Sequence, residues 1–379
     1  PAVMMIGQIM YALQSGKYDV NKTAVIVSQT GGGCRATNYI GYLRKALNDA
    51  GLSQVPILSL NSEGLEKQPG FTMNRGFVNR ILQGLIYGDT LMQCVLATRP
   101  YETVKGSVEA LFQKWLEKLK KDLLDADFMK YCRNVANIVK DFEALPAAPR
   151  TRPKVGIVGE IYVKFHPDAN NHIIRRIEQE GGEVITSGLM DFFLYCSMDA
   201  PYRTKYLAGS WLSGFLGNVG RHVLDFYRHP YVKAMKKSKR FDTPESIKDV
   251  AKRAAAFINL GNQSGEGWFL TGDMLDLIHK GARHVVCLQP FGCLPNHVTG
   301  KGMIRPLSEA YPDVRIAAID APESRQAFGT RARLNLLKLC AGRTATIQPH
   351  ETDRYGRTVA SVRCGNTDVA TAQVRAGLA

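Results

Sequence analysis

The sequence lacks any long hydrophobic run. No stretch of about 18 apolar residues occurs, which is the length that a transmembrane helix needs. The beginning, Pro1 to Met5, has neither a basic flank nor a long apolar run, so it does not predict a signal peptide. Internal repeats and low-complexity tracts are absent as well. A membrane is therefore not among the expected partners.

Cysteine is sparse, with eight residues spread over 379. A disulfide scaffold is shorter and much denser in cysteine, so this class of small secreted protein is excluded. We expect most of these side chains to be buried thiols. The composition predicts a reducing, cytoplasmic location.

Acidic residues are in deficit, because 34 Asp and Glu stand against 49 Lys and Arg, giving a formal charge of +15. Such a charge favours an anionic partner. The excess is dispersed, however, and we interpret its densest run, Lys233 to Arg240, as a solvated helix end rather than a binding patch. The length leaves room for two or three domains.

The first 150 residues predict an α/β unit. A β-branched strand at 23–28 is followed by a glycine loop, a helix at 36–50 and a strand at 55–60. The segment from Ala144 to Pro153 holds three prolines, which fix φ and remove backbone donors, so it predicts a linker. Residues 1–150 are therefore expected to form one Rossmann-like unit.

A second Rossmann-like unit is predicted over residues 151–314, giving a doubly wound α/β fold class. Its expected elements are strands at 154–158, 183–185 and 283–288, helices at 171–180 and 301–310, and a following strand at 314–320.

Residues 315–379 differ in character, with ten Lys and Arg against five Asp and Glu. The pattern predicts helices at 325–341 and 369–376 and a hairpin of strands 344–349 and 358–363 around a glycine-containing turn. This basic segment is expected to have nucleic acid as its partner.

Two loops carry most of the candidate chemistry. Gly31, Gly32 and Gly33 let the backbone approach a ligand, and Cys34 begins the next helix, where the helix dipole stabilises a thiolate. Cys34 therefore suits a metal ligand or a nucleophile, the alternative being a tight turn with an incidental thiol. Cys293 lies in a Gly/Pro loop after a strand, at the edge where open α/β sheets place their sites.

The other candidates each have a structural alternative. Cys287 is expected to be a packed strand residue, and Cys196 either a core thiol or a ligand. Glu160 follows a strand and either anchors a ligand or caps a helix. His297 either donates a hydrogen bond behind a ligand or flanks a helix, and the loop 261–267 is expected to be flexible.

Four segments of residues 1–320 resemble the 2-hydroxyacyl-CoA dehydratase family, and in particular its activase-related branch; they are 28–39, 158–162, 191–196 and 289–297. The resemblance implies Rossmann-like domains with a [4Fe-4S] cluster. Its ligands would be Cys34, Cys293 and, third, Cys196, with Gly31, Gly32, Gly33 and Glu160 binding the cofactor. It further implies one-electron-activated dehydration of a 2-hydroxyacyl-CoA, with ATP-dependent activase domains or a dehydratase subunit as partner.

From Arg315 onward the sequence is similar to the thermonuclease family, with its OB-type barrel. Arg315, Asp320 and Glu323 fall in its Arg-x4-Asp-x2-Glu motif, and Arg357 in its Asp-x-Tyr-Gly-Arg turn. The resemblance implies that Asp320 holds Ca²⁺, that Glu323 activates water and that Arg315 and Arg357 stabilise charge on a phosphodiester.

The family's first strands are expected before Arg315, where the α/β unit stands instead, so we expect this partial barrel to be inactive. Because each half is truncated where the other begins, we interpret the chain as a chimera. The first hypothesis is an iron–sulfur protein fragment of the dehydratase type. One alternative is a calcium-dependent phosphodiesterase acting through residues 315–379, and another is a non-catalytic electron-transfer or scaffold domain.

Overall fold

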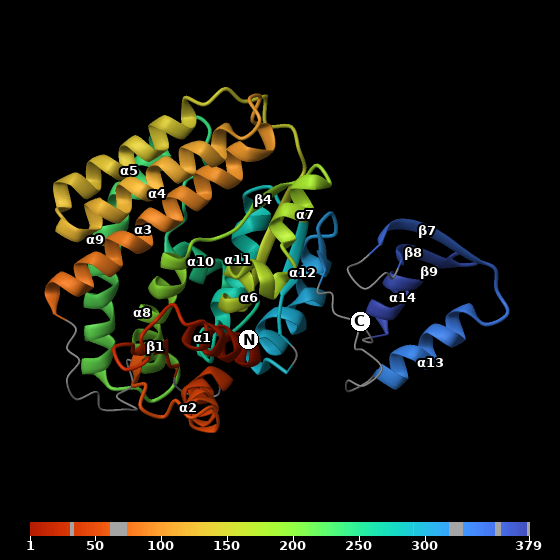
Figure 1. Cartoon of the computed structure of the whole chain (residues 1–379). Helices are drawn as coiled ribbons and strands as arrows, with labels where there is room; N and C mark the ends of the chain where they lie inside the picture. Colours follow the sequence, from red (N-terminus) through yellow and green to blue (C-terminus); the bar gives the residue numbers. More distant parts are fainter. Residues whose placement is uncertain (31–33, 61–73, 291, 318–328, 353–357, 377–379) are drawn as a thin grey trace. The chain divides into compact units, whose positions relative to one another are not determined.

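The computed structural model describes the chain except for residues 31–33, 61–73, 291, 318–328, 353–357 and 377–379. It divides into two compact units, Pro1–Ala317 and Ala318–Ala379 (Figure 1). The boundary predicted near residue 150 stays a prediction. One hydrophobic core contains residues from both sides of this boundary, as described below.

The first layer of the larger unit is a β-loop-α-β element, as predicted. Strands β1 (Val25–Ser28) and β2 (Ile57–Leu60) pair in parallel. Helices α1 (Ala2–Gln14) and α2 (Tyr39–Asp49) pack on them, and a 3-10 turn, η1 (Arg35–Asn38), precedes α2. The apolar side chains buried between these elements are Leu13, Val27, Leu43, Leu47 and Val55.

A four-stranded parallel sheet with the order β4-β3-β5-β6 forms the second layer. Its strands are β3 (Lys154–Gly159), β4 (Glu183–Ile185), β5 (His284–Leu288) and β6 (Arg315–Ala317). Gly159 ends β3 at φ 144°, and a Cβ there would lie 2.0 Å from the carbonyl oxygen of Leu288 on β5. Only glycine therefore lets β3 turn away so close to β5.

Helices connect the strands of this sheet. They are α6 (Ile161–Phe165), α7 (Ile173–Gln179), α10 (Ile247–Ala254), α11 (Gly267–His279) and α12 (Ile304–Ala310), with 3-10 turns η3 (Pro167–Asn170) and η5 (Lys301–Met303). Residues Gly267 to Ile278 of α11 are all buried. The helix expected at 301–310 is α-helical only from Ile304. A π-helical turn, η4 (Asn296–Gly300), and the 3-10 turn η5 precede it.

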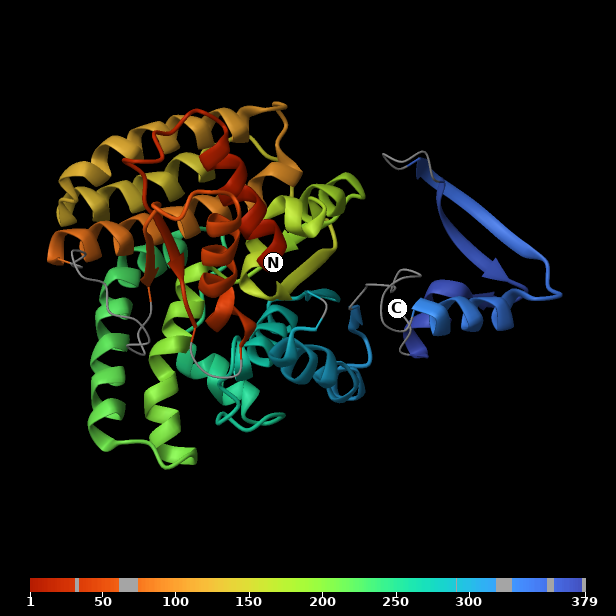
Figure 2. The ribbon, with the colours of Figure 1, turned by 60° about the horizontal axis from the view of Figure 1, so that its bottom comes forward.

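A helical layer makes up the rest of the larger unit (Figure 2). Its members are α3 (Arg75–Thr98), η2 (Arg99–Tyr101), α4 (Ser107–Asp125), α5 (Phe128–Glu143), α8 (Leu189–Tyr206) and α9 (Trp211–Lys237). Asn74 caps α3 and Asp127 caps α5, each by accepting a hydrogen bond from a first-turn N–H. Tyr131, Phe142, Tyr195 and Trp268 lie in the shared core, which joins α3–α5 to α8–α11.

The smaller unit is helix α13 (Gly329–Cys340), an antiparallel hairpin of β7 (Ala345–Thr352) and β8 (Thr358–Cys364), a short strand β9 (Thr367–Asp368) and helix α14 (Val369–Arg375). This order agrees with the predicted helix, hairpin and helix.

A disulfide between Cys340 and Cys364 joins the end of α13 to the end of β8. The sequence did not predict it, because 24 residues separate the two cysteines and only the fold brings their Cα atoms to 5.1 Å. The cysteines at 34, 94, 132, 196, 287 and 293 are free thiols. In the described part of the chain, no helix is both long enough and apolar enough to cross a bilayer.

Candidate functional site

The carboxyl ends of β3 and β5 bring several polar side chains together in the larger unit. β3 has a later strand on each side, so the chain leaves it toward β4 and later returns to pair β5 on the other edge. Such a switch point opens a crevice at the carboxyl ends of the strands. Glu160 follows β3 there, and its N–H donates to the carbonyl of Leu288 at the end of β5.

Two carboxyl groups lie at this edge, that of Glu266 buried and that of Glu160 partly buried. Glu160 accepts a hydrogen bond from the N–H of Val163 at 2.9 Å and so caps α6, the structural alternative predicted for it. Glu266, at the start of α11, accepts from the N–H of Ile161 at 3.1 Å. Burial, followed by the charge of Glu160, raises the pKa of Glu266 to about 7. Burial also raises the pKa of Glu160.

Cys293 and Asn296 complete this side of the site. The side-chain amide of Asn296 donates to Glu266 Oε2 at 2.8 Å and lies 3.2 Å from the Sγ of Cys293. Burial raises the pKa of Cys293, so the thiol form is favoured near neutral pH. Cys287, inside β5, is buried, and burial raises its pKa to about 12. It is thus a packed strand residue, as predicted.

The loop after β1 reaches the same place. Tyr39 is half-buried, and its pKa is raised to about 12 by burial and then by the nearby Glu160, Cys34 and Cys293. Gly292 lies close to the guanidinium of Arg35, since a Cβ on that glycine would be 3.6 Å from it. The structure therefore brings Cys34 and Cys293 into one neighbourhood, although they are far apart in sequence.

Four buried polar atoms of these two loops have no hydrogen-bond partner within the described ranges. They are the hydroxyls of Thr30 and Thr37, the amide oxygen of Gln289 and the amide oxygen of Asn296. Buried polar groups are paired in the great majority of cases, so the partners of these four atoms are either residues outside the described ranges or a polar ligand.

Cys196, the third expected ligand, lies exposed on α8. Among the described residues, no group of three or more His, Cys, Asp or Glu side chains is placed to hold a metal ion. A [4Fe-4S] cluster takes four thiolates, so the described residues do not by themselves make a cluster site. Gly31, Gly32 and Gly33 lie outside the described residues.

The nuclease-like residues are described only in part. Arg315 is exposed at the start of β6, opposite His284 of β5 in the parallel sheet. Asp320, Glu323 and Arg357 lie outside the described residues. The turn that carries Arg357 falls between β7 and β8 in sequence.

A family model described as "Staphylococcal nuclease homologue" matches residues 313–379. This C-terminal segment is thermonuclease-like. The match gives no support to the expected resemblance of residues 1–320 to the dehydratase family, and no solved structure matches the chain.

Several proteins of known sequence are similar to part of this chain. A "Micrococcal nuclease" of Shigella flexneri is 53% identical over 49 residues, which are 13% of this chain and 28% of that protein. "Staphylococcal-like nuclease CAN1" of Arabidopsis thaliana is 35% identical over 66 residues, 17% of this chain and 20% of that protein. "Protein ParB" of Escherichia coli is 51% identical over 49 residues, 13% and 28% of the two chains. The chain thus spans between a fifth and three-tenths of the length of these relatives.

Glu266 and Asn296 are functional candidates that sequence reasoning missed. Glu266 stands within the glycine-rich loop 261–267, which was predicted to be flexible and to cover a substrate, with no role for the glutamate, and it is 6% exposed. A glutamate among glycines directly before a helix whose first turn holds the apolar run Trp268 to Leu270 is the signal that could have pointed to it.

Proposed function

We propose that residues 313–379 act as a thermonuclease-type phosphodiesterase on DNA or RNA. The observation that carries the proposal is the family match, because it spans both the Arg-x4-Asp-x2-Glu motif and the Asp-x-Tyr-Gly-Arg turn. The net positive charge of this segment favours a polyanionic substrate. This supports the calcium-dependent alternative over the dehydratase hypothesis.

The proposed chemistry assigns one role to each motif residue. Glu323 accepts a proton from the water that attacks phosphorus, while Arg315 and Arg357 stabilise the added negative charge on the phosphoryl oxygens. The P–O bond to the leaving nucleoside breaks, and the leaving oxygen takes a proton from solvent. Asp320 is a hard oxygen donor of the kind that Ca²⁺ prefers, and the ion, when bound, would neutralise phosphate charge. Ca²⁺ takes six to eight oxygens in all, so further donors must join Asp320.

A digestion assay on the full chain tests this function. Single-stranded DNA is incubated with the parent, with Glu323→Gln and with Glu309→Gln, in Ca²⁺ and in chelator. Glu309 is an exposed α12 residue that pairs with Arg305, so it is a matched control outside the motifs. We expect cleavage that needs Ca²⁺, is unchanged in Glu309→Gln and falls by about 100-fold in Glu323→Gln.

Cleavage absent from the parent, or equal in Glu323→Gln, would overturn the proposal. The first of these results would agree with the inactivity that the sequence predicts. We also infer that the smaller unit, Ala318–Ala379, is part of an OB-type barrel and that the parallel sheets, β6 included, are Rossmann-like, doubly wound units.

A second candidate function belongs to the larger unit and rests on the convergence of Glu160, Glu266 and Cys293 at the switch point. With its pKa near 7, Glu266 can donate and accept a proton at neutral pH, which suits acid–base chemistry such as loss of water. We propose it as a lyase site of the 2-hydroxyacyl-CoA dehydratase type, with acyl-CoA as substrate and activase domains or a dehydratase subunit as partner. The alternative is a non-catalytic iron–sulfur electron-transfer or scaffold role, and a cytoplasmic location stays a prediction.

Iron and acid-labile sulfide per chain after anaerobic purification separate these possibilities. Iron and sulfide in the parent, both lost in Cys34→Ala and Cys293→Ala but kept in Cys132→Ala, would support a cluster at this edge. A parent without iron would remove both cluster-based functions and leave the acid–base pair as a site without a metal.

A further inference from the structure

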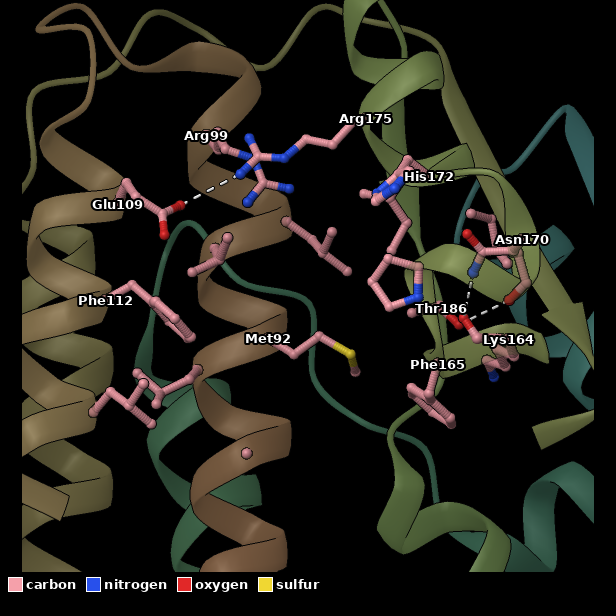
Figure 3. Close-up of a pocket in the computed structure, with 18 residues that line it drawn as sticks. Met92, Arg99, Glu109, Phe112, Lys164, Phe165, Asn170, His172, Arg175 and Thr186 are labelled. Carbon is pink, nitrogen blue, oxygen red and sulfur yellow. Dashed lines mark hydrogen bonds and ion pairs between the residues drawn. The ribbon is translucent and has the colours of Figure 1, made fainter. Parts of the chain in front are cut away.

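A cavity of about 490 Å³ lies between α3, α4 and the segment from β3 to α7 (Figure 3). This volume is in the range of small-molecule sites. Most of its wall is apolar, with Leu91, Met92 and Val95 from α3, Phe112 and Leu116 from α4, and Phe165 from α6. It is a different place from the edge where Glu160 and Glu266 meet.

The polar groups at the inner wall already have partners. Lys164 Nζ contacts Asp273 at 3.1 Å and Ser187 at 2.7 Å. The hydroxyl of Thr186 donates to the carbonyl of Ile157, and Asn170 donates to the carbonyl of Val163. An apolar cavity whose polar neighbours are satisfied holds water poorly and favours an apolar guest.

Charged groups gather at the other end of the cavity. Figure 3 shows Arg99, Arg175 and Glu109 there, away from Met92 and Phe165. Arg99 makes a two-pronged contact with Glu178, at 2.9 Å and 2.7 Å. Arg99 is therefore held in place by a carboxylate of its own.

Arg175 is held much less firmly. It donates to Glu109 at 3.4 Å, and both side chains are about half exposed, at 53% and 48%. Its contact with Glu178 is longer, at 3.9 Å. Exposed pairs of this kind contribute little free energy, and a guanidinium has five donors in a fixed fork. An anion can therefore take the place of Glu109 on Arg175.

We propose that this cavity binds an amphiphile, with an aliphatic chain along α3 and α4 and an anionic, oxygen-bearing head group on Arg175. The apolar wall selects the chain and the planar guanidinium selects the head group. Neither the nuclease-like segment nor the site at the β3–β5 edge takes part in this binding.

Gly88 supplies a clean way to close the cavity. It lines the cavity from α3, and a Cβ built there meets nothing within 4 Å. A leucine at this position would occupy the space of the chain. Leucine is also the better helix former, by about 1 kcal/mol for a helix interior, so the variant is expected to fold. Gly220, on α9, also has open space around it and is the matched control.

The test is calorimetric titration of the full chain with decanoate, decyl phosphate and decanol. We expect decanoate or decyl phosphate to bind the parent and Gly220→Leu with equal affinity. The same anion should bind Gly88→Leu at least about tenfold more weakly. Arg175→Gln should lower the affinity for the anion by about tenfold and leave the affinity for decanol unchanged. The comparison of the two anions identifies the head group.

Two results would overturn the proposal. One is the absence of binding to the parent by either anion. The other is unchanged affinity in a folded Gly88→Leu protein, with thermal unfolding confirming that it is folded. If Arg175→Gln lowered the affinity for decanol as much as for the anion, the assigned recognition of the head group would be wrong.

Discussion

The two units of this chain are held together by different means. The larger unit buries Trp268, Tyr131, Tyr195 and Phe142 almost completely. In the described part of the smaller unit, the buried side chains are Ala332, Cys364, Val369 and Gln373. Leu334, Leu337 and Ile347 of that unit are at least half exposed. Apolar burial therefore stabilises the first unit far more than the second.

Specific links replace a core in the smaller unit. The disulfide closes the stretch from α13 to β8, and Gln373 of α14 donates to the carbonyl of Ala332 at 2.8 Å while accepting from Asn335. Small domains often depend on disulfides and similar specific links, because a short stretch of chain buries too little apolar surface. The comparison teaches that the small unit should respond to reduction and the large unit to changes inside its core.

The largest effect is expected at a buried ion pair of the larger unit. Lys164 and Asp273 are each 3% exposed, so Lys164→Met leaves the carboxylate of Asp273 buried without its cation. We expect a loss of about 4 kcal/mol in the free energy of unfolding, followed by tryptophan fluorescence in urea. All three tryptophans, at 115, 211 and 268, are in this unit. Combining Lys164→Met with Asp273→Leu should recover much of the loss, and a double variant as weak as the single one would contradict this.

Removal of the disulfide is expected to act on the smaller unit alone. Cys340→Ser with Cys364→Ser restores the freedom of the chain between them in the unfolded state, at a cost of about 3 kcal/mol. Amide hydrogen exchange should rise across β7, β8 and α14, while tryptophan fluorescence does not change. Cys196→Ser, at an exposed free thiol, is the control. Unchanged exchange in the smaller unit would show that its helices and hairpin hold without the staple.

A pH titration tests a buried carboxyl group of the larger unit. Asp89 accepts from the N–H groups of Leu189 and Met190, both at 2.8 Å, and burial raises its pKa from 3.8 to about 7. The folded state then binds a proton more tightly than the unfolded state. The stability that Asp89 contributes is therefore fully present below about pH 4 and is lost as the pH rises through 7. We expect the free energy of unfolding of the larger unit to fall by up to about 4 kcal/mol across this range. Asp89→Asn should flatten it, and an equal slope in that variant would contradict the assignment.

Local pattern was enough to predict much of the fold. The β-branched runs gave β1 and β3, and β4 has the predicted bounds of Glu183 to Ile185. The hairpin of β7 and β8 followed from its turn residues. These elements are short-range features, and hydrophobic alternation and glycine placement report on them directly.

Features that depend on distant residues could not be predicted in the same way. The pairing of Glu266 with Asn296 joins the start of α11 to a π-helical turn that no residue pattern announces. The cavity by Arg175 is walled by α3 and α4 on one side and by residues between Ile157 and Thr186 on the other. Cys34 and Cys293 were predicted as candidates from their loops, but their nearness to Glu160 and Glu266 depends on the tertiary fold.

The π-helical turn at Asn296–Gly300 has a consequence for how this protein can change over generations. A π turn holds one residue more than the α-helical turn that it replaces, and here the N–H of Lys301 bonds to the carbonyl of Asn296. Loss of a single codon in this stretch would let the backbone revert to an ordinary helix and swing the Asn296 amide away from Glu266. Deletion of one residue in this stretch is therefore expected to remove the hydrogen bond between Asn296 and Glu266.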